Sequence, residues 1–172
     1  MNEDKALEAL VWLAHKQPGI DAFHVSKVLY FADKEHLNRY GRPILGDTYI
    51  RMEYGPVPSQ TYDLIKKASP KKNVPRKLRE AIEVREGFRH VYPRRKPNME
   101  MFSRTDRACL TKALEKYGNR DFSDLSKISH KQPAWKNARE NGKMDYEDMI
   151  EQSPKRKAII QNLKEHSRQI AL

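Results

Sequence analysis

The feature that most constrains the fold is the spacing of apolar residues, which recur every three or four positions in runs separated by glycine or proline. This spacing places the apolar side chains on one face of a helix, and the separators end one helix before the next begins. The pattern predicts helices over residues 3–16, 22–40, 59–67, 104–117, 124–129, 133–141 and about 154–171. We therefore expect a mainly α chain of the α+β class.

Polar residues, glycines and a proline at the expected helix ends support these limits. Serine and aspartate accept hydrogen bonds from the first free amides of a helix, and a glycine after the last turn adopts a left-handed conformation at low cost. The residues in question are Asp21 and Gly41 around the helix 22–40, Ser103 and Asp106 as a capping box before the helix 104–117, and Ser153-Pro154 before the last helix.

Two short stretches have the composition of β-strands. Residues 49–52, Tyr-Ile-Arg-Met, are β-prone and roughly alternating, which predicts a strand. Residues 82–84 and 89–91 flank Glu86-Gly87 and resemble a hairpin. Residues 55–58, Gly-Pro-Val-Pro, are expected to break the chain as a stiff corner between a strand and the helix 59–67. The sequence thus predicts a small antiparallel sheet or hairpin within one helical domain over residues 1–172.

Charge is unevenly distributed along the 172 residues. The formal net charge is +11, and residues 66–107 alone carry 14 Lys and Arg against 5 Asp and Glu, a net charge of +9. This basic segment contains Lys71-Lys72, Arg76-Lys77 and Arg94-Arg95-Lys96. It is typical either of a surface that attracts nucleic acid or an acidic protein, or of a solvated loop.

The sequence also indicates a compartment. Its single cysteine, Cys109, excludes an internal disulfide, and no apolar run approaches the ~20 residues of a membrane helix. The first residues are acidic and polar, unlike a secretory signal. We expect a cytoplasmic protein without membrane contact.

Motifs of the common enzyme classes are absent from the sequence. Phosphate-binding loops, dinucleotide fingerprints, nucleophile elbows and zinc spacings do not occur. Asp33 and His36 lie three residues apart on one predicted helix, where acid–base chemistry, a metal or an ordinary hydrogen bond would each explain them. We favour the hydrogen bond, and expect no enzyme activity, no cofactor and no metal.

Two segments, about 25–62 and 125–135, together resemble the Panacea (SocA-like) antitoxin family. The first carries Leu-Tyr-Phe-Ala-Asp at 29–33, Tyr-Gly at 40–41, Pro-Ile at 43–44, Gly-Asp at 46–47 and Tyr-Gly-Pro-Val at 54–57. The second carries Leu125-Ser126 and Ser129-His130, followed by Trp135. The order of the whole set is specific, although each piece alone would be weak.

The resemblance implies an antitoxin of a bacterial or phage toxin–antitoxin system, which neutralises a cognate protein toxin by direct contact. It also allows an adaptor that delivers the toxin to a Clp-type protease. The residues themselves leave a third interpretation open, a basic nucleic-acid-binding module that uses residues 66–107 and the neighbouring aromatics Phe88 and Tyr92, with weak and non-specific binding.

Candidate partner-binding residues follow from both lines of reasoning. They are Asp33, Tyr54, Gly55, Pro56, Val57 and His130 in the motif segments, and Arg94, Arg95 and Lys96 in the basic segment. A polar pair that braces a turn would explain Asp33, Tyr54 and His130 equally well. Trp135 is interpreted as a core anchor, because large aromatic side chains mostly pack inside.

Overall fold

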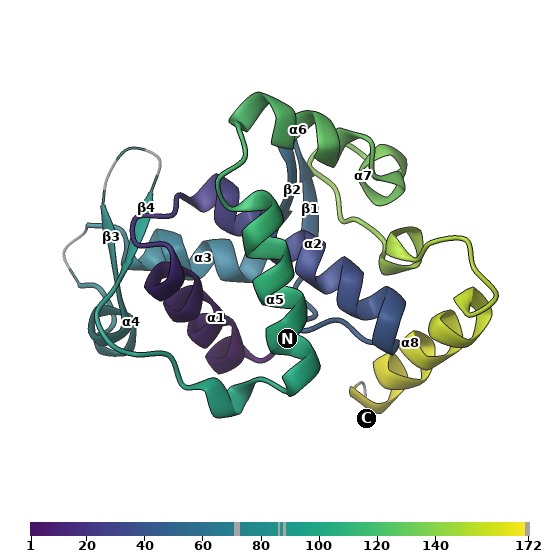
Figure 1. Ribbon diagram of the computed structural model, residues 1–172, viewed down its shortest axis with the longest axis horizontal. Helices are drawn as coiled ribbons and strands as arrows, with labels where there is room; N and C mark the ends of the chain where they lie inside the picture. Colours follow the sequence, from purple (N-terminus) through teal and green to yellow (C-terminus); the bar gives the residue numbers. More distant parts are fainter. Residues whose placement is uncertain (71–72, 86, 88, 171–172) are drawn as a thin grey trace.

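The long helix α2 (Ala22–Tyr40) runs through the middle of the fold and contacts elements on both sides (Figure 1). In the computed structural model, residues 1–70, 73–85, 87 and 89–170 are described, the last five of them without their side chains. Within these residues there are eight α-helices, two 3-10 helices and two separate antiparallel ribbons of two strands each. The prediction of a mainly α domain with small antiparallel sheets is confirmed.

One side of α2 packs against the elements that contain the N-terminus. These are α1 (Glu3–Lys16), α3 (Ser59–Ala68), α4 (Arg76–Ala81) and the ribbon of β3 (Ile82–Arg85) with β4 (His90–Pro93), together with η1 (Met99–Met101). Helix α5 (Arg104–Tyr117) packs against α2 in the middle of the view (Figure 1). Their apolar faces form a single core that includes Leu10, Leu13, Leu29, Ile65 and Leu110, each at most 1% exposed.

The other side of α2 packs against a second, smaller core. It is enclosed by β1 (Tyr49–Met52), β2 (Gly55–Pro58), α6 (Phe122–His130), α7 (Pro133–Asn137), η2 (Tyr146–Met149) and α8 (Arg156–Ile170). Tyr30, Leu37, Tyr49 and Leu125 are fully buried there. Helices α6 and α7 lie at the same end of the molecule as the β1–β2 hairpin (Figure 1).

The predicted helix caps are present. Asp21 accepts a hydrogen bond from the amide of His24 at the start of α2, and Gly41 ends that helix at a φ of +78°. Ser103 and Asp106 form the capping box of α5 in both directions. The local side-chain chemistry therefore sets these ends.

Several boundaries differ from the sequence predictions, and one element was assigned wrongly. Residues 55–58 are not a corner but the strand β2, which pairs with β1 in the register Met52↔Gly55 and Tyr49↔Pro58. Helix α7 ends at Asn137, and α8 begins at Arg156 because residues 154–155 form a turn. Lys71, Lys72, Glu86 and Phe88 lie outside the described residues.

The hairpin of β3 and β4 is confirmed at Ile82↔Pro93 through Arg85↔His90. In the part of the chain that the structure describes, no helix is both long enough and apolar enough to cross a membrane.

Candidate partner-binding face

The tip of the β1–β2 hairpin is held by side chains from α6 and α7. His130 donates from Nε2 to the carbonyl oxygen of Glu53 at 2.8 Å, and Trp135 donates from Nε1 to that of Met52 at 3.0 Å. The guanidinium of Arg51 lies 4.1 Å from the Trp135 ring and donates to the carbonyl of Ala138 at 2.7 Å. The two motif segments, distant in sequence, therefore meet at this tip.

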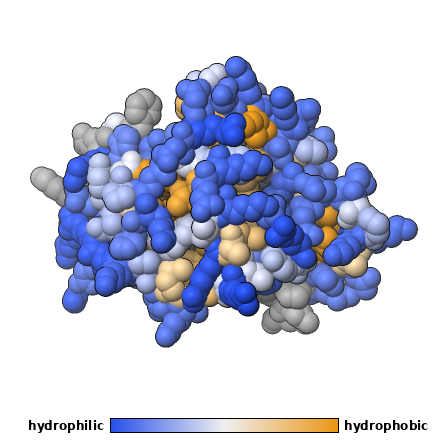
Figure 2. Space-filling view, viewed as in Figure 1, coloured by the Kyte–Doolittle hydropathy of each residue, from blue (hydrophilic) through white to orange (hydrophobic). Residues whose placement is uncertain are grey.

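Exposed aromatic side chains gather beside the same tip. Tyr54, in the turn of the hairpin, is 51% exposed, and Phe122, at the start of α6, is 46% exposed. Their ring centroids lie 5.2 Å apart, and Phe122 contacts Phe23 of α2 at 4.3 Å. We call Phe23, Tyr54 and Phe122 the aromatic face. Most of the surface in the view of Figure 2 is hydrophilic, with a few apolar patches.

A buried lysine lies beneath the aromatic face. Lys27 is 1% exposed, and its Nζ donates to the carbonyl oxygen of Pro56 at 3.1 Å and lies 4.4 Å from the centre of the Phe23 ring. Burial lowers the pKa of Lys27 to about 7, although the charge of Asp21 acts in the opposite direction. A large part of the Lys27 population is thus uncharged at neutral pH.

Gly55 allows the strand to approach this lysine closely. Its φ is +110°, and a Cβ atom there would lie 2.7 Å from both Lys27 Cε and Ser129 Cβ. Only glycine fits without moving the Lys27 side chain and helix α6. Gly55 and Pro56 are buried and Val57 is half-buried, so Tyr54 is the exposed member of this predicted group.

His130 and Trp135 are half-buried rather than central to the core. Their rings stack at 4.1 Å with an angle of 23° between the planes. The expectation that Trp135 is a core anchor is therefore met only in part, since the residue packs against the second core but stays partly accessible. Both residues position the hairpin tip.

Asp33 lies away from the aromatic face. It is 1% exposed and accepts hydrogen bonds from the amides of Ile44 and Leu45 and from the hydroxyl of Tyr49, at 2.8–3.0 Å. Burial raises the pKa of Asp33 to about 6, while these three donors lower it. The carboxylate braces the loop after α2, so the structure supports the bracing interpretation at this position.

The expected hydrogen bond between Asp33 and His36 is not formed, because each binds other partners. Nδ1 of His36 donates to the carbonyl oxygen of Arg42 at 2.7 Å, and its Nε2 lies 2.9 Å from the Thr105 hydroxyl and 3.1 Å from an Asp106 carboxylate oxygen. Among the described residues, no three His, Cys, Asp or Glu side chains are grouped so as to hold a metal ion.

The basic loop after β4 is far from the hairpin tip in the fold. Arg94, Arg95 and Lys96 are exposed. Arg95 nevertheless forms an ion pair with Glu8 of α1, and Arg94 lies 3.6 Å from Glu83 of β3. Two of the three charges are therefore partly neutralised within the chain, and the loop belongs to the side of the fold that contains α1.

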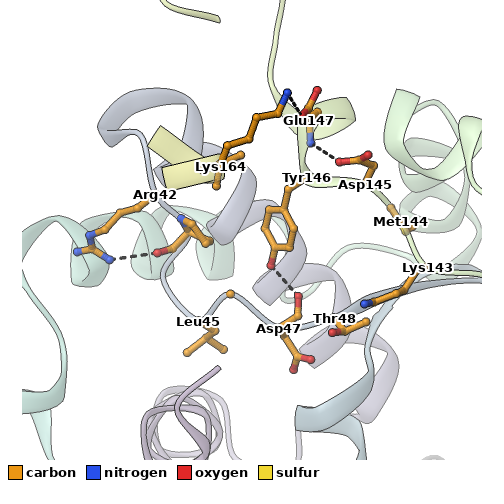
Figure 3. Close-up of a pocket in the computed structure, with 13 residues that line it drawn as sticks. Arg42, Leu45, Asp47, Thr48, Lys143, Met144, Asp145, Tyr146, Glu147 and Lys164 are labelled. Carbon is orange, nitrogen blue, oxygen red and sulfur yellow. Dashed lines mark hydrogen bonds and ion pairs between the residues drawn. The ribbon is translucent and has the colours of Figure 1, made fainter. Parts of the chain in front are cut away.

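A hollow of about 810 Å³ lies beside residues 42–48, which belong to the first motif segment. Figure 3 shows Tyr146 pointing into it, where its hydroxyl donates to the carbonyl oxygen of Asp47 at 2.7 Å. The Asp47 carboxylate accepts hydrogen bonds from the amides of Gln60 and Thr61 and so caps α3. Its lining includes both cations and carboxylates, and Lys164 pairs with Glu147 at 3.2 Å. The hollow therefore has no preferred sign of charge.

Sequence reasoning missed Phe23, Lys27 and Phe122. A signal was present, because Phe23, Lys27 and Tyr30 have helical i, i+4, i+7 spacing and thus share one face of α2. On that face the lysine lies between two aromatic residues. Phe122 carries no such signal, since it is the first residue of α6 and its exposure depends on how α6 is placed over the hairpin.

Fold and face together define a mainly helical α+β domain with an exposed aromatic hairpin tip. A family model described as "Antitoxin SocA-like, Panacea domain" matches residues 25–136, about two thirds of the chain. The chain belongs to this antitoxin-like family, as its motifs suggested. No curated protein and no solved structure matches it.

Proposed function

We propose that this protein is the antitoxin of a toxin–antitoxin system, which acts in the cytoplasm and neutralises a protein toxin by binding it directly. Membership of the antitoxin-like family gives the class of partner. The observation that carries the binding proposal is the pair of exposed rings, Tyr54 and Phe122, at the point where the two motif segments meet.

The architecture of the aromatic face suits recognition of a protein. Large aromatic side chains supply much of the binding energy at protein interfaces, and a face that is already rigid loses little entropy on binding. Hydrogen bonds from His130 and Trp135 to the hairpin backbone fix the tip before any partner arrives. The role is that of a binding protein, without chemistry of its own.

The test is co-expression with the product of the neighbouring reading frame, with growth as the readout. Tyr54→Ala and Phe122→Ala should each lose neutralisation while their melting temperatures stay close to that of the wild type. Tyr40→Ala is the matched control, because Tyr40 is 47% exposed but lies at the far end of α2. Normal neutralisation by both face variants would place the toxin contact elsewhere.

Delivery to a Clp-type protease is the alternative mechanism for the same face. The two differ in the fate of the toxin: direct inhibition leaves its level in cells unchanged, whereas an adaptor shortens its half-life only while the protease is present. A pulse-chase of the toxin in cells with and without the protease separates them. We favour direct inhibition, because a rigid face of exposed aromatic side chains provides a complete binding surface by itself.

A further inference from the structure

Lys27 combines deep burial with few partners. An ammonium group has three donors, and an ion of this kind is costly to bury unless it is paired. Nζ of Lys27 makes one hydrogen bond, to the carbonyl oxygen of Pro56, and one ring contact, to Phe23. No ion pair within the described residues includes it.

The surrounding groups do not supply the missing counter-charge. Asp21, at the start of the same helix, is the one carboxylate that favours the ammonium, but it is already bound to the amide and Nδ1 of His24 at 2.9 and 2.8 Å. His24 itself acts against a second positive charge nearby. From β2 the lysine faces the Pro56 carbonyl, and from α6 the uncharged Ser129 approaches the same glycine that Lys27 touches.

Phe23, the half-buried member of the aromatic face, separates this lysine from the two exposed rings. Phe23 covers Nζ, is itself only half-buried, and contacts Phe122, which in turn contacts Tyr54. Phe23 is thus the side chain that a partner would have to displace in order to reach the ammonium.

We propose that a protein partner bound at the aromatic face inserts a carboxylate, from an Asp, a Glu or a chain end, that pairs with Lys27. This inference rests on the proposed function and specifies the chemistry of the toxin segment: apolar, so as to cover the rings, with one carboxylate among its apolar groups. The pair would form in a water-poor site, where opposite charges attract most strongly and an uncharged partner segment is rejected. Pro56 keeps its hydrogen bond, since the ammonium has donors to spare.

Pairing of this kind takes up a proton. With a pKa of about 7, Lys27 is charged in about nine tenths of the free molecules at pH 6 and in about one tenth at pH 8. Apparent affinity scales with the fraction of competent molecules. The affinity for the toxin should therefore fall by roughly tenfold from pH 6 to pH 8, with proton uptake of about one half at pH 7.

The experiment compares wild-type protein with Lys27→Met, which keeps the length of the side chain and removes the charge. The probe is the purified product of the neighbouring reading frame, titrated calorimetrically at pH 6, 7 and 8 in two buffers of different ionisation enthalpy. Lys127→Met is the matched control, because Lys127 is an exposed lysine of α6. We expect Lys27→Met to melt no lower than wild type, to bind at least tenfold more weakly at pH 6, and to lose the pH dependence.

Three results would overturn the proposal. The first is that Lys27→Met binds with unchanged affinity, and the second is that the affinity of the wild type is the same at pH 6 and pH 8. The third is that Lys27→Met keeps the pH dependence, which would then belong to a histidine. If Lys27→Met does not fold, the wild-type pH series and the NMR shift of the Lys27 ε-carbon with and without the toxin decide alone. If the Lys27 proposal fails but Tyr54→Ala loses binding, the proposed function stands. If all these variants bind like the wild type, both the Lys27 proposal and the proposed function are wrong. If nucleic acid competes with the toxin for Lys27, this would also contradict pairing with a carboxylate of a protein partner.

Discussion

Replacing Gly55 with alanine tests the close approach of β2 to α2 and α6. Two independent costs apply. A residue with a side chain at a φ of +110° is strained by about 1–3 kcal/mol. The new Cβ would also lie 2.7 Å from Ser129 Cβ, a position fixed by α6, which adds about 1–3 kcal/mol of overpacking. The free energy of unfolding should fall by about 2–6 kcal/mol, the sum of the two ranges.

Gly87→Ala separates the two costs. Gly87 has a φ of +85°, but no atom of the other described residues lies within 4 Å of the position that its Cβ would occupy. It should therefore show the strain alone, and Gly55→Ala should be less stable than Gly87→Ala by about 1–3 kcal/mol. Chemical denaturation followed by circular dichroism measures both. For a domain of this size the extra loss corresponds to roughly 2–12 °C in melting temperature.

Equal destabilisation by the two alanines would refute the packing argument, because it would mean that β2 and α6 separate at no cost. Gly55→Ala with native stability would further mean that the hairpin is held differently from the structure described above. Loss of neutralisation by a well-folded Gly55→Ala variant would instead indicate that the shape of the aromatic face had changed.

Three other predictions concern the surrounding structure. Trp135→Ala should lower the free energy of unfolding by about 1–3 kcal/mol. This is less than the loss expected for truncation of a fully buried tryptophan, because the indole is half-buried. Thermal melting checks this, and a larger loss would mean that Trp135 is a core anchor after all. Burial by itself would raise the pKa of Asp106, but hydrogen bonds from Lys5 and the Ser103 amide lower it. This carboxylate therefore contributes stability that is present above its unfolded pKa and is lost as pH falls through its folded pKa. Asp106→Asn should flatten the decline of stability below about pH 4, and a stability curve that is unaltered in acid would contradict this. Changing Lys96 to Glu should reduce weak, steeply salt-dependent DNA binding at unchanged melting temperature. Adding Arg94→Glu and Arg95→Glu should also lower the melting temperature, because the new carboxylates repel Glu83 and Glu8. Tight, sequence-selective DNA binding by the wild type would favour the nucleic-acid interpretation instead.

The elements that local chemistry determines could be predicted from the sequence. The limits of α1, α2 and α5 follow from apolar spacing and from the capping residues Asp21, Gly41 and Ser103, and the structure has them where the sequence placed them. The β3–β4 hairpin follows from its turn residues in the same way. Such features depend on residues only a few positions apart.

The strand β2 could not be predicted in this way. Two prolines in four residues suggest a break, because proline lacks the donor that a central strand needs. In the structure β2 has just one neighbouring strand, so prolines are tolerated on its other edge. The candidate site divides similarly: Tyr54 was identified from the motif, whereas Lys27 and Phe122 gain their significance from contacts between elements far apart in sequence.

The prolines of β2 determine how a partner can engage the hairpin. In the observed register, Arg51 and Tyr49 direct their backbone groups away from β2, toward residues 141–144, so the opposite residues Pro56 and Pro58 direct theirs away from β1. On β1 that edge is occupied: Arg51 donates to the Gly142 carbonyl, and Met144 donates to the Tyr49 carbonyl, each at 2.9 Å. On β2 the outward positions have no N–H, and the Pro56 carbonyl is bound by Lys27. A partner protein therefore cannot extend this ribbon by adding a strand of its own, and neither can a second copy of the chain. In the proposed antitoxin role, the choice of toxin would be made by side chains, which can change among family members while the backbone stays the same.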